Sequence, residues 1–244
     1  MRGLVRFAFV LLAVSLTTAA VRAAEPVDLL LVLAADVSRS ISQEKFELQR
    51  QGYAAAIAEP RVLDAIRSGL NGRIGLLFLE WSGSASQNVV INWTIIDGPQ
   101  AAQKFGDQLL ELPRSFADRT SISGAIDYAM TQIARAPFSA KRRTIDVSGD
   151  GTNNAGRDVA AARDEALAAG VTINGLVIFS DHPLAWNPEH TNPPGGLATY
   201  YRNNVVGGPG AFVLEAKDFN AFGQAIINKL IAEIALAEPA ASRR

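Results

Sequence analysis

The sequence contains no cysteine, and it has only two histidines and two methionines among 244 residues. Without cysteine the chain can form no disulfide, and it lacks the thiol through which a bacterial lipoprotein is anchored. Its stability must therefore come from a buried core. About 220 residues remain once the N-terminal segment discussed next is set aside, which is enough for one large domain.

Long apolar runs are also scarce. Arg2 and Arg6 precede a single apolar stretch from Phe7 to about Val21, which falls short of the roughly 18 residues that a spanning helix needs. Val21 and Ala23 are small enough for a secretory cleavage site. We expect residues 1–23 to be a Sec-type signal peptide, so that the mature chain is secreted or periplasmic and has no membrane span. The alternative is a retained membrane anchor.

An excess of basic charge is absent as well. The chain has 23 Lys and Arg against 24 Asp and Glu, and removing residues 1–23 takes away three arginines and no acid. The remaining 20 basic and 24 acidic side chains give a net charge near −4. A nucleic-acid partner would want a basic face, so this balance argues against one.

What the sequence does have is an alternation of apolar strands and helices. Most connections between the strands are long enough for parallel pairing, whereas the second and third strands are close enough for an antiparallel hairpin at the sheet edge. This pattern predicts a doubly wound α/β fold with a mostly parallel sheet, one antiparallel edge strand and helices on both faces. The predicted strands are 27–36, 73–82, 88–96, 142–150, 171–180 and 211–216.

Oxygen-bearing side chains follow several of these strands. The first strand ends in "DVSRS", which holds Asp36, Ser38 and Ser40, and the strand "TIDV" leads to "SGDG" with Asp150. Thr120 precedes the helix of "SISGAI". Ligands of such folds sit beyond the carboxyl ends of the strands, so these five groups can meet there. Oxygen donors alone suit a hard divalent cation, and neutral hydroxyls favour Mg²⁺ over Ca²⁺; Mn²⁺ and Ca²⁺ remain alternatives.

The three segments "DVSRS", "TSISGAI" and "SGDG" resemble the metal-ion-dependent adhesion site (MIDAS) of von Willebrand factor A (VWA) domains, which have a Rossmann-like fold. The resemblance covers 27–237, leaving 238–244 as a flexible tail. With "IDVSGDG" and "YYRNNVVGGPGAF" the chain is also similar to an uncharacterised branch of secreted bacterial VWA-like proteins. The resemblance implies that Ser38, Ser40 and Thr120 are hydroxyl ligands. It implies that Asp36 and Asp150 bind the metal directly or through water, and that a carboxylate of a partner protein completes the shell.

Two residues depart from the family pattern. Arg39 stands where many relatives carry glycine, and its charge either competes with the metal or attracts an acidic partner. Gly149 replaces a hydroxyl residue before Asp150, which removes an oxygen that could support the site.

Other polar residues have simpler interpretations. Asp146 lies inside an apolar strand, so we expect it to have a buried partner and a structural role. His182 and His190 lie in the proline-rich segment 181–196; we interpret them as exposed loop residues, with a zinc site as the alternative. Because this segment leaves from the metal edge, it is expected to form a ligand-facing rim with His182, Trp186 and Arg39.

Three functions remain open. The first is a binding module that captures a carboxylate of a protein or peptide through the metal, with no catalytic residue. The second is a Mg²⁺-dependent hydrolase or phosphotransferase, which would need a base such as Asp181 or His182. The third is a VWA scaffold without metal function.

Overall fold

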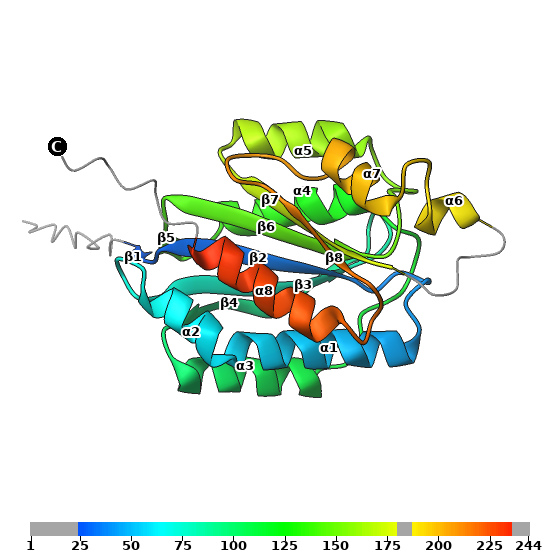
Figure 1. Cartoon of the computed structure of the whole chain (residues 1–244). Coiled ribbons are helices and arrows are strands. Elements are labelled where there is room, and N and C mark those ends of the chain that lie inside the picture. The colour runs from blue at the N-terminus through cyan, green and yellow to red at the C-terminus, as the bar shows by residue number, and fades with distance from the viewer. Residues whose placement is uncertain (1–23, 180–186, 236–244) are drawn as a thin grey trace, which may run out of the picture.

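The structure is a computed structural model and describes residues 24–179 and 187–235. Its centre is a six-stranded sheet in the order β4-β3-β2-β6-β7-β8, in which only β3 and β4 pair antiparallel. The strands are β2 (Leu29–Asp36), β3 (Ile74–Trp81), β4 (Gln87–Ile96), β6 (Arg142–Gly149), β7 (Thr172–Ile178) and β8 (Val213–Ala216). The predicted α/β class and the antiparallel edge strand are confirmed (Figure 1).

Helices cover both faces of this sheet (Figure 1). One face carries α1 (Gln43–Ala58), α2 (Pro60–Arg67), α3 (Pro99–Glu111) and α8 (Phe222–Ala235). The other carries α4 (Ile122–Ala134), α5 (Val159–Ala168) and α7 (Leu197–Asn204). A short helix, α6 (Pro188–Thr191), lies at the end of the molecule where the parallel strands finish.

Strand β2 is buried on both sides, as a continuous apolar run predicts. Leu31 and Leu33 pack into the core under α1 and α8, whereas Val32 and Ala34 pack into the core under α4 and α5. This alternation follows from the two-residue period of a strand. Because β2 lies between β3 and β6, the residue that ends it is placed at the middle of the sheet edge.

The two edge strands of the sheet differ in length and exposure. β4 is ten residues long and half-exposed, whereas β8 has four residues and carries the exposed Glu215. A feature that the sequence did not predict is the two-residue pairing of β1 (Glu25–Pro26) with β5 (Phe138–Ser139). Among the described residues, no helix has the length and apolarity needed to cross a membrane.

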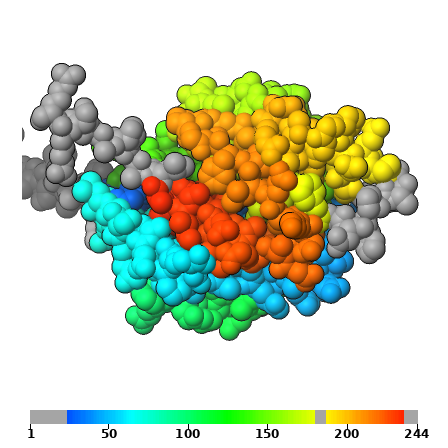
Figure 2. Space-filling model, in the orientation of Figure 1, coloured from blue at the N-terminus to red at the C-terminus, as the bar shows by residue number. Residues whose placement is uncertain are grey.

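The predicted partner of Asp146 is Lys229 of α8, whose Nζ lies 2.7 Å from Asp146 Oδ1. Both side chains are fully buried, and Lys229 also contacts Glu233 one turn later. Asn174 of β7 donates a 2.8 Å hydrogen bond to Glu233. The last helix, which lies on the outside of the molecule in Figure 2, is therefore joined to the two inner strands β6 and β7 by a buried ionic cluster.

Candidate functional site

Asp36 and Asp150 lie side by side at the carboxyl edge of the sheet. Asp36 is the last residue of β2 and Asp150 directly follows β6, and these two strands are parallel neighbours. Both carboxylates are buried, at 0% and 1% exposure. The arrangement follows from topology, because parallel neighbouring strands end at the same edge.

The loop after β2 folds its polar groups back onto these two acids. The backbone N–H of Ser38 donates a 2.7 Å hydrogen bond to Asp36 Oδ1. The Ser38 and Ser40 hydroxyls are 3.1 Å apart, and Ser40 donates a 2.6 Å hydrogen bond to Asp150 Oδ1. Four of the five predicted metal ligands are thus joined in one chain of contacts.

One oxygen of each acid has no hydrogen-bond partner among the described residues, namely Asp36 Oδ2 and Asp150 Oδ2. Burial, followed by the charge of Asp150, raises the pKa of Asp36 from 3.8 to about 8. Burial also raises the pKa of Asp150, against the lowering effects of Ser40 and Lys45. Two buried, unsatisfied carboxylates this close are costly unless a cation or a proton compensates them.

Lys45 of α1 supplies part of that compensation. Its Nζ lies 3.9 Å from Asp150 Oδ2, and its side chain is 26% exposed. The ammonium also lies 4.9 Å from the ring centre of Phe219. At this distance and exposure the pair is a loose one, so Lys45 is a competitor that a divalent cation would have to displace or tolerate.

Thr120, the fifth predicted ligand, is buried directly before α4. Its backbone is fixed by Asn154, which accepts a 2.9 Å hydrogen bond from the Thr120 N–H and donates its own N–H to the Thr120 carbonyl oxygen at 2.8 Å. Thr120 therefore lies against the loop that follows Asp150. No hydrogen bond joins its hydroxyl to Ser38 or Ser40 in the described part of the chain; the hydroxyl oxygen lies near His190 Nε2 instead.

The interpretation of His190 as an exposed loop residue is wrong. It is 3% exposed, and its Nε2 lies 3.2 Å from the Thr120 hydroxyl oxygen while its Nδ1 lies 3.2 Å from that of Thr152. The Cβ of any side chain at Gly151 would be 2.3 Å from His190 Nε2, so glycine is needed for this approach. Burial lowers the pKa of His190, which favours the neutral ring. α6 thus brings His190 into the site, which no periodic pattern in the sequence indicates.

Arg114 is a second residue that the sequence did not single out. Its Nη2 donates hydrogen bonds to the carbonyl oxygens of Val37, Ser38 and Ile41, at 2.9, 3.2 and 2.7 Å. One guanidinium thus holds the whole loop that carries Ser38 and Ser40.

The segment around Arg114 is itself anchored by a buried ion pair. Glu80 of β3 accepts a 2.8 Å hydrogen bond from the Ser115 N–H and lies 2.6 Å from Arg50 of α1. Both partners of this pair are almost fully buried. Arg114 therefore holds the serine loop by hydrogen bonds to its carbonyl oxygens. The backbone next to Arg114 is in turn held by Glu80, which is paired with Arg50.

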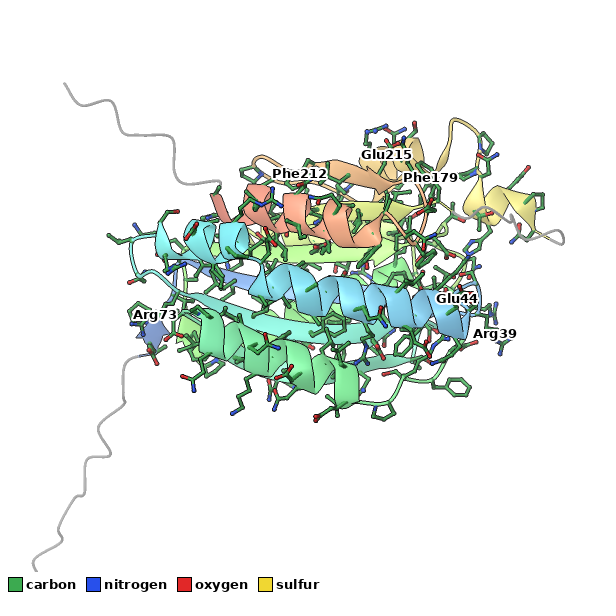
Figure 3. The ribbon with its side chains drawn as sticks, turned by 60° about the horizontal axis from the view of Figure 1, so that its bottom comes forward. Arg39, Glu44, Arg73, Phe179, Phe212 and Glu215 are labelled. Carbon is green, nitrogen blue, oxygen red and sulfur yellow. The ribbon has the colours of Figure 1, made fainter. Side chains whose placement is uncertain are left out.

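Of the predicted rim residues, only Arg39 lies within the described residues; His182 and Trp186 lie outside them. Arg39 is on the serine loop and 71% exposed, and its Nη2 lies 3.7 Å from Asp118. Figure 3 shows Arg39 pointing outward at the end of the molecule opposite Arg73. The exposed Phe116 follows Arg114 on the neighbouring loop, so charged and apolar groups both border the site.

The donor set fits a hard divalent cation. Its groups are hydroxyls and carboxylates, and two buried carboxylate oxygens lack partners among the described residues. Within residues 24–179 and 187–235, no three His, Cys, Asp or Glu side chains gather into a metal-binding group, so the site depends on its hydroxyls. The same finding gives no support to the zinc alternative for His190, and His182 lies outside the described residues.

A family model described as "Protein of unknown function (DUF1194)" matches residues 26–238. No curated protein matches the sequence. Several solved structures are similar in fold. Proximal thread matrix protein 1 (PTMP1) from the mussel byssus is 11% identical with a TM-score of 0.58, over 86% of this chain and 47% of that one. Another PTMP1 structure, described as having a "zinc occupied MIDAS motif", is 12% identical with a TM-score of 0.53 over 86% and 46%.

Two further similar structures are bacterial. The pilus adhesin SpaC from Lactobacillus rhamnosus GG is 13% identical with a TM-score of 0.56, over 88% of this chain and 31% of that one. A von Willebrand factor type A protein from Catenulispora acidiphila is 14% identical with a TM-score of 0.57, over 86% and 43%. The chain spans less than half the length of each of these proteins. At such identities the likeness shows the fold alone, and that fold is VWA-like.

Proposed function

The chain belongs to the DUF1194 family, and from that premise and the geometry at its sheet edge we propose a secreted or periplasmic protein-binding module. In this module the residues at the carboxyl edge of the sheet would hold a divalent cation, whose charge would serve to bind an acidic group of a partner protein or peptide. The observation that carries this proposal is the pair of buried carboxylate oxygens, Asp36 Oδ2 and Asp150 Oδ2, that lack a hydrogen-bond partner in the described structure. A cation is the group that satisfies two such oxygens at once.

In this proposal the hydroxyls of Ser38, Ser40 and Thr120 and the carboxylates of Asp36 and Asp150 hold the ion as a MIDAS. The ion supplies a concentrated positive charge that attracts a carboxylate of the partner. The chain's own residues do the rest. Ser40 orients Asp150 by its hydrogen bond, and Arg114 keeps the serine loop in place. We favour Mg²⁺, with Mn²⁺ and Ca²⁺ as alternatives, because hydroxyl ligands suit an ion that keeps part of its water shell.

The similar structures support the proposal without deciding it. SpaC is a pilus adhesin, and one PTMP1 structure has zinc in its MIDAS motif. Residues 1–23 have the pattern of a Sec-type signal peptide, and the acidic balance of 27–237 argues against a nucleic-acid partner. A catalytic role would require a base aimed at bound water. Both ring nitrogens of His190 already face hydroxyl groups, so we do not propose one.

The proposal is tested by pairing each acidic peptide of an immobilised library with its amide counterpart, in which Glu and Asp become Gln and Asn. Binding is measured in Mg²⁺ and in chelator. We expect binding that requires both Mg²⁺ and the carboxylate. The Ser38→Ala/Ser40→Ala double variant should lose it, whereas Ser68→Ala, an exposed serine of the α2 C-terminus, should not. Equal binding of acid and amide peptides, or binding that survives the chelator, would contradict the proposal.

A further inference from the structure

Tyr201 of α7 has a hydroxyl that is buried and has no hydrogen-bond partner among the described residues. A buried tyrosine hydroxyl normally finds a partner, because leaving one unsatisfied is costly. Tyr201 is fully buried, and no part of the hydroxyl is available to solvent. The position of this group must therefore be explained by something in its immediate surroundings.

The Tyr201 hydroxyl lies beside Asp36, one of the two acids at the carboxyl edge of the sheet. A Cβ placed on Gly149 would lie 2.7 Å from the Tyr201 hydroxyl oxygen and 3.0 Å from Asp36 Oδ2. The hydroxyl and the carboxylate oxygen therefore face the same small space, which is empty of side chain only because residue 149 is glycine. Asp36 Oδ2 is also unsatisfied among the described residues. One is a donor and the other an acceptor, so each supplies what the other lacks.

From this reciprocal placement we infer that Tyr201 is a positioning residue of the metal site. The two groups make no direct hydrogen bond in the described structure, so the hydroxyl donates to Asp36 Oδ2 through one water molecule and in this way fixes the carboxylate for the cation. A group that hydrogen-bonds to a metal-binding carboxylate commonly sets the orientation of that carboxylate. Loss of such a group weakens metal affinity about 10- to 100-fold. The charges of Asp36 and Asp150 also help to raise the pKa of Tyr201, after burial, which is consistent with their closeness.

The inference also accounts for Gly149. A serine or threonine at position 149 would place its hydroxyl near Asp36 from the end of β6. Its Cβ, however, would collide with the Tyr201 hydroxyl. In this chain the supporting oxygen comes from α7, and glycine makes the room for it. Combining Gly149→Ser with Tyr201→Phe would move the hydroxyl from α7 to the end of β6 and should serve the same purpose. The inference rests on the proposed function, because it names a residue of the same metal site.

The test is a cycle of variants followed by calorimetric titration with Mg²⁺ and by thermal unfolding in chelator. Tyr201→Phe should bind Mg²⁺ at least about tenfold more weakly than the unaltered protein. Gly149→Ser should also bind weakly, because the collision displaces Tyr201 or Asp36. The double variant Gly149→Ser/Tyr201→Phe should regain an affinity within a few-fold of the unaltered protein. Gly149→Ala/Tyr201→Phe fills the same space without a hydroxyl and should remain weak.

Tyr128→Phe, on the half-buried face of α4, is the matched control and should leave Mg²⁺ affinity unchanged. A merely structural role for Tyr201 would predict that serine and alanine rescue equally, and that result would overturn the inference. Undiminished Mg²⁺ affinity in Tyr201→Phe would overturn it as well and leave the proposed function standing. Failure of the unaltered protein to bind any divalent cation would overturn the proposed function and this inference together.

Discussion

The hydroxyl of Ser40 donates a 2.6 Å hydrogen bond to the carboxylate of Asp150, across 110 positions of the sequence. This contact joins the loop after β2 to the loop after β6, and it brings together two of the three segments that resemble a MIDAS. The other oxygen of Asp150 has no hydrogen bond from the described residues. The two acids are thus held close together, and Lys45 compensates their charge only in part, so several measurable properties depend on this pair.

Replacing Asp36 with Asn should separate stability from metal binding. Asn keeps an oxygen that can accept the Ser38 N–H, but it removes a buried charge that lies beside Asp150. We expect the metal-free variant to be more stable than the unaltered protein by about 1–3 kcal/mol, and its Mg²⁺-dependent stabilisation to disappear. Thermal unfolding with Mg²⁺ and with chelator measures both effects. A variant that is still stabilised by Mg²⁺ would remove Asp36 from the ligand set.

The metal-free protein should lose stability as the pH rises from about 4 to about 8. The pKa of Asp36 is raised from 3.8 to about 8 in the folded state, so the folded protein keeps a proton that the unfolded chain has already released. This group therefore favours folding most below about pH 4, and its contribution declines by at most about 1.4 kcal/mol per pH unit through that interval.

Mg²⁺ should reduce that loss of stability, because a cation binds the ionised carboxylate. The stabilisation produced by Mg²⁺ should therefore be larger at pH 8, near the folded-state pKa of about 8 where much of the Asp36 carboxyl is ionised, than at pH 6, where the folded carboxyl is mostly protonated. Denaturant unfolding at several pH values, with Mg²⁺ and with chelator, measures the two slopes. Parallel slopes would show that Asp36 does not share its proton equilibrium with the cation.

Lys45→Met should increase Mg²⁺ affinity about fivefold. The Lys45 ammonium lies 3.9 Å from Asp150 Oδ2, where it competes with a cation for the same oxygen, and a partly exposed pair of this kind contributes about 1 kcal/mol or less. Lys104→Met, which removes an exposed lysine of α3, is the control for the change in net charge. Calorimetric titration compares the three proteins. Weaker binding in Lys45→Met alone would mean that the ammonium supports the site.

Arg114→Ala should reduce both stability and Mg²⁺ affinity, because three backbone carbonyl oxygens of the serine loop lose their donor. We expect a loss of about 2–3 kcal/mol in unfolding free energy. Arg114→Lys should recover only part of it, since one ammonium cannot reproduce the geometry of the guanidinium. Arg61→Ala, at an exposed position of α2, serves as the control. Hydrogen exchange at residues 37–41 that matches the unaltered protein would contradict this role.

Lys229→Met should destabilise the protein by about 3–5 kcal/mol, because it leaves Asp146 and Glu233 buried without a cation. Adding Asp146→Asn to that variant should restore part of the loss, since Glu233 keeps its hydrogen bond from Asn174. Denaturant unfolding of the single and double variants gives the coupling energy. Equal and additive losses would show that the three charges do not act as one cluster.

The meeting of Asp36 and Asp150 could be predicted because it depends only on strand order and direction. A continuous apolar run predicts β2, a strand is also predicted over 142–150, and parallel neighbours end at one edge. The buried partner of Asp146 follows from the cost of a lone buried acid, although its identity as Lys229 does not. Both predictions follow from the pattern of apolar and polar residues along the sequence, without knowledge of any interatomic distance.

Residues that reach the site from irregular segments could not be predicted. His190 lies in a proline-rich stretch without a periodic pattern, and its burial depends on the glycine at 151 leaving room for the ring. Arg114 binds backbone carbonyl groups, and because every residue has one, no residue type in the sequence identifies its partners. In the sequence Tyr201 is one aromatic residue of a short helix, and only its closeness to Gly149 reveals the connection with Asp36.

The short strand β8 limits how the sheet can pair with another chain at that edge. It ends the sheet after four residues, and its exposed Glu215 is held by Arg202 of α7 at 2.7 Å. A brief, charged border of this kind offers little template for another chain to add a strand. The β8 edge of the sheet is therefore a poor site for a strand of another molecule to pair with.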